Sequence, residues 1–151
     1  MKKLLLQAIV CASVLLPFSV AEAKTYGGFK PGKTFTFTVK EVVSIKAVGF
    51  SKPVKAPVPS GVLKLTKGQK VQFKIGASGQ LTAKGLSIPF KADGGSANVY
   101  TKVTTGAKPA ADTAQVFKTS KNVPTAVSLS FVRASYAGFN TTTNTVAYTL
   151  K

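Results

Sequence analysis

The sequence predicts a single all-β domain with the architecture of a β-sandwich, and three observations support this prediction. Short segments in which apolar and polar residues alternate recur along residues 34–150, and a period of two is typical of half-buried strands. Turn segments rich in Gly, Pro and Asn separate them at short intervals. No segment has the three-to-four-residue spacing of a useful amphipathic helix, and β-branched residues and Phe dominate.

The first 23 residues have the composition of a cleavable secretory signal peptide. Lys2 and Lys3 precede an apolar run over residues 4–16, and residues 21–23 form a small-x-small cleavage box. The run is shorter than the about 20 residues that a membrane span needs. We therefore divide the chain into a signal peptide, residues 1–23, and one basic domain, residues 24–151. We expect this domain to be secreted or periplasmic by bacterial export, with no transmembrane segment after cleavage.

The first expected strand covers residues 34–39, where Phe35, Phe37 and Val39 alternate with threonines. Residues 42–48 continue it with a change of face, which a β-bulge would produce. The stretch 52–59 contains three prolines, and proline cannot donate to a sheet ladder. We therefore predict an extended loop there.

Residues 62–75 are expected to form a hairpin. Leu63 and Leu65 alternate with polar residues, as do Val71 and Phe73 after a short glycine-containing segment. A loop of residues 67–69 places Leu65 opposite Val71, so that the apolar residues share a face, whereas a two-residue turn would not. The alternative is a turn that crosses between two packed sheets.

Five further strands are expected towards the C-terminus. They cover residues 81–90, 97–103, 114–118, 126–132 and 146–150, and Pro89 places an edge or a bulge in the first of them. About seven short strands with regular turns predict an immunoglobulin-like or pilin-like antiparallel β-sandwich in outline, and a small β-barrel is the alternative.

The composition excludes most enzyme chemistry. The chain has no His, and its one Cys, Cys11, lies in the signal peptide. The acidic residues that follow the signal are Glu41, Asp93 and Asp112, which are far apart in the sequence. General base catalysis, thiolate chemistry and transition-metal binding therefore lack their usual side chains. We predict a protein that is not an enzyme and that binds no cofactor or metal.

Positive charge is the main functional signal in the sequence. The chain has 21 Lys and Arg against 4 Asp and Glu, a net charge of +17. On the expected hairpin, Lys64, Lys70 and Lys74 share the outward face and Lys67 lies at the tip. Such a surface attracts polyanions. We predict low-specificity binding to anionic polysaccharide, lipopolysaccharide or another polyanion at a cell surface or in a matrix, and the other interpretation is that the charge only keeps the domain soluble.

Sequence-specific nucleic acid recognition is not expected, because the chain has no recognition-helix pattern and only one arginine, Arg133. Further outward lysines are predicted at Lys40, Lys91, Lys102 and Lys118. The apolar faces place four aromatic residues in the core, Phe35, Phe37, Phe73 and Phe131. Three tyrosines lie off these faces and are candidates for exposure, Tyr26, Tyr100 and Tyr136.

Two alternative functions remain open. The segment Phe35, Phe37 and Val39 follows a Gly-rich leader and is similar in outline to the donor strand of a fimbrial subunit, which would imply self-assembly. A secreted inhibitor or toxin would instead act through exposed loops, for which residues 52–59 and 138–141 are the candidates.

Overall fold

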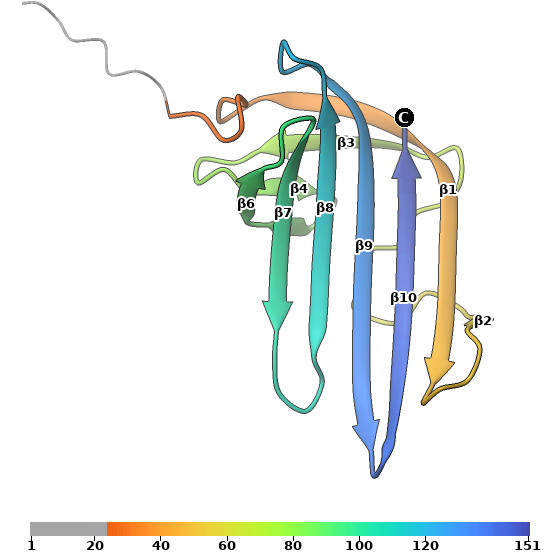
Figure 1. Cartoon of the computed structure of the whole chain (residues 1–151). Helices are drawn as coiled ribbons and strands as arrows, with labels where there is room; N and C mark the ends of the chain where they lie inside the picture. The colour runs from red at the N-terminus through yellow and green to blue at the C-terminus, as the bar shows by residue number, and fades with distance from the viewer. Residues whose placement is uncertain (1–23) are drawn as a thin grey trace, which may run out of the picture.

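The computed structural model describes residues 24–151, which form one antiparallel sheet of ten strands (Figure 1). The predicted signal peptide, residues 1–23, lies outside the described residues. The strands are β1 (Thr34–Val48), β2 (Val54–Lys55), β3 (Lys70–Ile75), β4 (Leu81–Ala83), β5 (Leu86–Ile88), β6 (Phe90–Asp93), β7 (Ala97–Thr104), β8 (Ala110–Lys118), β9 (Pro124–Ala137) and β10 (Asn140–Leu150).

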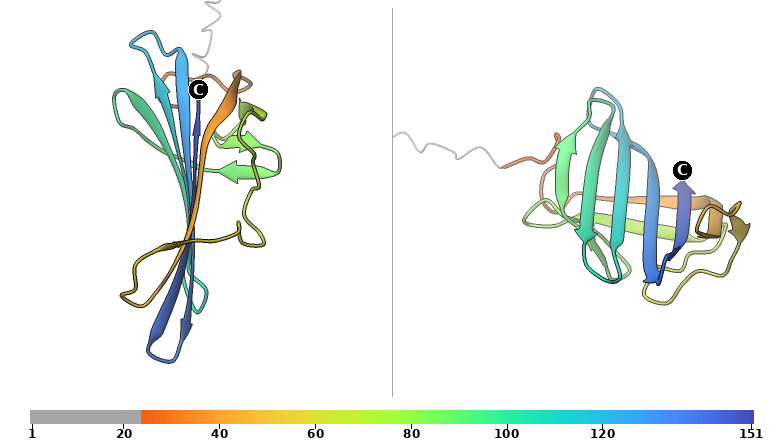
Figure 2. Two further views of the ribbon diagram at one scale, coloured as in Figure 1. Left: turned by 90° about the vertical axis from the view of Figure 1, so that its right-hand side faces the viewer. Right: turned by 60° about the horizontal axis from the view of Figure 1, so that its bottom comes forward.

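The all-β prediction holds, but the two-sheet immunoglobulin-like or pilin-like sandwich is wrong. Nine strands of the single sheet turn through 299° and nearly close a barrel (Figure 2). The strand order is β5-β4-β3-β1-β10-β9-β8-β7-β6, so the two open edges are strands that follow each other in the chain. Pro89 lies between these two edge strands, at the edge predicted for it. A proline is tolerated there because its nitrogen has no hydrogen to donate to a neighbouring strand.

A bend in β1 explains why one sheet forms instead of two. The first half of β1 pairs with β3, with Phe35 opposite Phe73, and the second half pairs with β10. The register shifts between Val39 and Glu41, which is the predicted bulge. Because one long, bent strand pairs on both sides, the β3–β5 segment continues the same sheet and curls over its apolar face.

The predicted hairpin between residues 63–65 and 71–73 does not form. Residues 62–66 belong to no strand, and β3 pairs with β1 and β4. The turn before β3 exists, since the Gln69 amide donates to the Thr66 carbonyl at 3.0 Å. The segment before it crosses the interior face of the sheet, where the Tyr148 hydroxyl donates to the Leu63 carbonyl at 2.6 Å. Leu65 is buried there without strand pairing.

The core lies inside the curled sheet. Phe73 and Phe131 are buried as predicted, and Phe35 and Phe37 are partly buried against them. Tyr100 was expected to be exposed, but it is fully buried. Its ring packs edge-on against Phe90, with 5.6 Å between the ring centroids. The other buried apolar residues include Phe29, Val39, Val71, Ile75, Leu81, Ile88, Ala114, Val116, Val127, Leu129, Val146, Tyr148 and Leu150.

The longest strands extend beyond this core. β9 and β10 have 14 and 11 residues, and with the end of β1 they project past the curled β3–β5 segment (Figures 1 and 2). Hydrophobic residues at this end are exposed, among them Val48, Phe50, Val54, Tyr136 and Phe139. The projecting part of the sheet therefore has no core of its own on either face.

Candidate functional site

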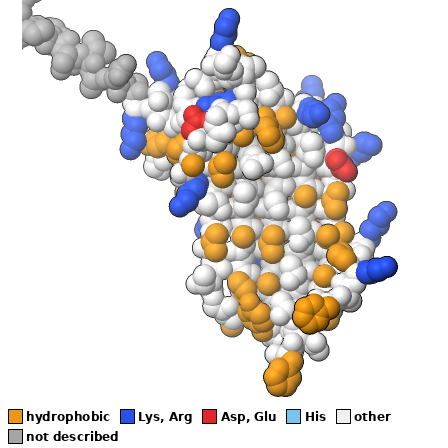
Figure 3. Space-filling view, in the orientation of Figure 1, with side chains coloured by type: hydrophobic (Ala, Val, Ile, Leu, Met, Phe, Trp, Pro, Cys, Tyr) orange, Lys and Arg blue, Asp and Glu red, His pale blue; other side chains and the backbone are white. Residues whose placement is uncertain are grey.

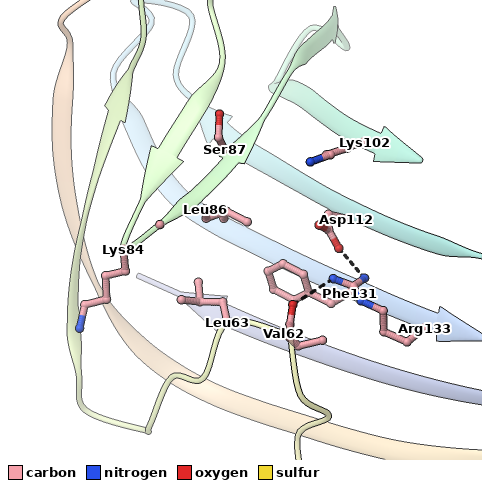
Figure 4. Close-up of a pocket in the computed structure, with 11 residues that line it drawn as sticks. Val62, Leu63, Lys84, Leu86, Ser87, Lys102, Asp112, Phe131 and Arg133 are labelled. Carbon is pink, nitrogen blue, oxygen red and sulfur yellow. Dashed lines mark hydrogen bonds and ion pairs between the residues drawn. The ribbon is translucent and has the colours of Figure 1, made fainter. Parts of the chain in front are cut away.

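A cleft of about 330 Å³ opens on the interior side of the sheet. Its walls come from the segment 61–63, from β5, and from side chains of β7, β8 and β9 (Figure 4). Phe131 and Leu63 provide apolar surface. Asp112, Arg133 and Lys102 provide the charged groups on the β7–β9 side. The cleft lies between β5, at one open edge of the curled sheet, and strands β7–β9, to which β5 is not paired.

The only arginine of the chain is held by an ion pair inside this cleft. Arg133 Nη1 lies 2.6 Å from Asp112 Oδ1 and donates to the Val132 carbonyl at 2.9 Å. A longer contact of 3.5 Å joins Nη2 to the Gly61 carbonyl. Both side chains are largely shielded, with 25% and 20% of their surfaces exposed. This arrangement fixes the guanidinium between the sheet and the crossing segment.

Asp112 and Arg133 neutralise each other, so the net positive charge of the cleft comes from Lys84 and Lys102. Lys102 is the cross-strand neighbour of Asp112, and Figure 4 shows it on the wall of the cleft above this pair. Lys84 also lines the cleft, but its side chain points away from the pair. Within residues 24–151, no group of three or more His, Cys, Asp or Glu side chains could hold a metal ion.

The structure places three of the four predicted polyanion-binding lysines together. Lys70 and Lys74 are exposed on the outer face of β3, alternating with the buried Val71 and Phe73. Lys67 lies in the turn that leads into the strand. Lys64 is exposed too, but it belongs to the crossing segment and not to a hairpin arm.

Sequence reasoning missed Lys151 as a neighbour of this group. Thr38 is paired with Lys70 on one side, and on the other side it exchanges two backbone hydrogen bonds with Lys151, at 2.9 and 3.0 Å. Directly opposite residues share a face, so Lys70 and Lys151 flank Thr38 about 10 Å apart across three strands. Only the pairing of β1 with both β3 and β10 brings them together. We call Lys67, Lys70, Lys74 and Lys151 the β3 lysine face.

Lys118 is not an outward lysine, which corrects the prediction. Its side chain is 4% exposed, and its Nζ lies 2.8 Å from Asp93 Oδ2 and 2.5 Å from the Gly27 carbonyl oxygen. The hydrogen bond from Lys118 lowers the pKa of the Asp93 carboxyl. Lys40 and Lys91 are exposed as expected. Lys102 is also exposed, but it lies on the same face of β7 as the buried Tyr100 and lines the interior cleft, which corrects its outward placement. Lys118 therefore holds the N-terminal segment against the sheet.

The segment proposed as a donor strand is paired within its own chain. Phe35 and Phe37 lie opposite Phe73 and Val71 of β3, and Val39 lies opposite Leu150 of β10. Val39 is buried, and the two phenylalanines pack against the core. A donor role would require this strand to leave both neighbours.

No protein-family model, curated protein or solved structure matches this chain. Among residues 24–151, no helix is long and apolar enough to cross a membrane.

Proposed function

We propose that this protein is an exported, non-enzymatic binding protein that interacts electrostatically with anionic polymers of a cell surface or matrix. The supporting observation is the uncompensated charge of the β3 lysine face. In residues 24–151 the ion pairs are Lys118–Asp93 and Arg133–Asp112, so these lysines have no carboxylate side chain of that region within 4.0 Å. A ligand that binds these lysines therefore does not have to break an ion pair within the protein.

The spacing of the lysines suits a linear polymer better than a compact ligand. Lys70 and Lys74 are four residues apart on one strand face, about 13 Å, and Lys151 lies about 10 Å to the side. Each ammonium is a flexible, hydrated point charge, so it attracts carboxylate, sulfate or phosphate groups without demanding a fixed geometry. Affinity should therefore depend strongly on salt and weakly on the repeat unit.

The first prediction is that K67Q/K70Q/K74Q weakens binding to alginate, dextran sulfate and lipopolysaccharide by about tenfold at low salt, since exposed charge pairs contribute up to about 1 kcal/mol each. Its binding should also depend less on salt. Binding of residues 24–151 is measured by isothermal titration calorimetry in about 20 and about 150 mM NaCl, where the screening length falls to about 8 Å.

The matched control is K91Q/K108Q/K121Q, which removes the same charge from three exposed positions outside the β3 lysine face. Equal losses in the two variants would show that only the net charge matters and would contradict a defined binding face. An unchanged affinity in K67Q/K70Q/K74Q, with its thermal unfolding unaltered, would have the same consequence.

A further inference from the structure

The end of the sheet farthest from the β3 lysine face carries three exposed aromatic side chains. Phe50 and Phe139 are 111% and 109% exposed relative to an extended chain, and Tyr136 is 61% exposed. We call Phe50, Tyr136 and Phe139 the aromatic tip. Figure 3 shows hydrophobic side chains gathered over this lower end, with Lys and Arg towards the rim of the molecule.

Two neighbouring turns form the aromatic tip. The Gly49 amide donates to the Thr141 carbonyl at 2.8 Å, and Val48 pairs with Thr142 beside it. The turn that presents Phe50 is closed by a bond from the Ser51 amide to the Val48 carbonyl at 3.0 Å. The two phenylalanines are therefore carried on one hydrogen-bonded support.

The fold does not require an aromatic side chain at either turn. β9 and β10 are joined by the two-residue turn Gly138–Phe139, in which Gly138 has a φ of +57°. Such turns need glycine at the position with positive φ, and their other position usually holds a small polar residue. Phe139 contributes no burial to the core. Exposed apolar side chains that gather in one place without a structural role are typical of a contact with something outside the chain.

The tip can enter an apolar phase without burying a charge. Residues 134–150 contain no Asp, Glu, Lys or Arg, and neither do residues 47–51. The sheet behind the tip is rich in threonine, and its central strand β10 is paired there on both sides, with β1 and β9. A bilayer interface tolerates paired backbone and aromatic side chains, and tyrosine is enriched at that depth.

Lysines lie behind the tip at the depth of lipid headgroups. Lys46 is paired with Asn144 and with Val54, two residues or about 7 Å behind Val48. Lys52 follows the Phe50 turn, and Lys55 is on β2. All three are exposed and have no carboxylate partner among the described residues. Amphipathic elements that rest in a membrane surface bury about 5–10 Å of apolar face and attract anionic lipids with Lys.

From these observations we infer that the aromatic tip inserts into the surface of a bilayer that contains anionic lipid. The charge of the domain favours this occupant over a second copy. Residues 24–151 have 19 Lys and Arg and 3 Asp and Glu, a net charge of +16, so two copies repel each other while anionic headgroups attract the tip lysines. The site is separate from the β3 lysine face, since β10 runs the length of the sheet from the tip to Lys151 (Figure 1).

The test uses residues 24–151, which hold the whole described fold, and vesicles of phosphatidylcholine with or without about 30% phosphatidylglycerol. We expect the protein to sediment with the anionic vesicles. F50S/F139S should bind them at least about tenfold more weakly, because insertion of each ring is lost. The control F117S/V123S removes two exposed apolar groups at the opposite end and should bind like the wild type. K46Q/K52Q/K55Q should have a weaker preference for anionic over neutral vesicles than K91Q/K108Q/K121Q, which removes the same charge elsewhere.

The chain has no Trp, so F139W provides a single reporter of insertion depth. Its fluorescence should shift to the blue and be quenched by brominated lipid only with anionic vesicles. Equal vesicle binding by F50S/F139S and wild type, or an unshifted F139W spectrum, would overturn the inference. Concentration-dependent self-association of the wild type that F50S/F139S abolishes, without vesicle binding, would overturn it in favour of a second copy.

The outcome can be separated from that of the proposed function. K67Q/K70Q/K74Q should bind polymer about tenfold more weakly and keep the blue shift of F139W on anionic vesicles. F50S/F139S should keep polymer binding. If the prediction for one surface fails, the prediction for the other surface still stands.

Discussion

The Tyr100 side chain is the clearest case of a residue whose position the sequence pattern does not give. It alternates with Val99 on β7, which suggested an outward ring, but the sheet curls so that its face becomes the interior. Its hydroxyl has no hydrogen-bond partner among the described residues. Burial raises its pKa to about 12.

This pKa gives the third prediction. A tyrosine whose pKa is raised on folding contributes stability below its usual pKa of 10.0, and this stability is lost as the pH rises towards 12. Between about pH 8 and pH 11 the wild type should therefore lose about 1 kcal/mol more than Y100F. Urea unfolding at the two pH values measures this difference. Near neutral pH, Y100F should be at least as stable as the wild type, because it removes a buried hydroxyl without a partner.

A result in which both proteins lose the same stability at high pH would show that Tyr100 ionises freely in the folded state. Burial also raises the pKa of Tyr148. Its contribution is common to both proteins and cancels in the comparison.

The N-terminal segment is joined to the sheet by a hydrogen bond from Asn98 Nδ2 to the Tyr26 carbonyl at 3.2 Å and by the buried Lys118. Phe29 is 1% exposed, the Lys118 ammonium lies 5.9 Å from the centre of its ring, and the same ammonium binds the Gly27 carbonyl and Asp93. A side chain at Gly27 would overlap Asn98 and could not adopt its φ of +58° without strain. The docking of this element therefore depends on a charge that only Asp93 neutralises.

The fourth prediction follows from this ion pair. The pKa of Asp93 is lowered in the folded protein, so its contribution to stability is present above its usual value of 3.8 and is lost as the pH falls through the lower, folded value. D93N should be less stable than the wild type at about pH 6, because it leaves Lys118 buried without its carboxylate. The gap between the two proteins should close towards about pH 2.

Chemical denaturation across this pH range measures the gap, and amide exchange of residues 26–29 reports on the docked segment. A gap that stays constant down to about pH 2 would mean that Asp93 acts through packing and not through its charge.

At the element scale, the sequence predicted local features of each strand better than it predicted which strands pair. The alternation in residues 34–39, the bulge after Val39, and the edge at Pro89 were all correct, because each depends on a few adjacent residues. The hairpin 63–73 was wrong because inward leucines at a spacing of two occur equally in a strand and in an extended segment that covers a core. The hydrogen bond from Tyr148 to Leu63 joins residues 85 positions apart, which no local pattern reveals.

For the whole molecule, alternation shows which side chains face inward but not whether the sheet divides or curls. A sandwich and a near-barrel of the same strands bury most of the same apolar residues, with Tyr100 as an exception, so the sequence left both possible. Three of the four predicted lysines lie together because strand alternation was correct on β3, while Lys151 required the topology. Of the aromatic tip, the sequence analysis identified only residues 138–141, as a candidate exposed loop. The exposure of a turn can be predicted from adjacent residues, but Phe50 belongs to another hairpin and only the fold brings it close.

The fifth prediction concerns the charge of the whole domain. Most lysines face solvent and the described region has two ion pairs, so repulsion between lysines should oppose folding. Raising NaCl from about 20 to about 500 mM shortens the screening length to under about 5 Å and should raise the Tm. Chloride is preferred to sulfate, because sulfate also strengthens apolar burial. K91Q/K108Q/K121Q should have a higher Tm than the wild type at low salt, and the two should converge at high salt.

The same measurement separates a binding surface from a merely soluble one. A ligand that binds the folded state stabilises it in proportion to its occupancy, whereas simple salt acts only through screening. At a fixed ionic strength of about 150 mM, dextran sulfate should therefore raise the Tm of the wild type above the value in NaCl alone, and should do so less for K67Q/K70Q/K74Q. If dextran sulfate raises the Tm no more than NaCl of the same ionic strength, the lysines do not bind the polymer. Their charge would then serve only to keep the domain in solution.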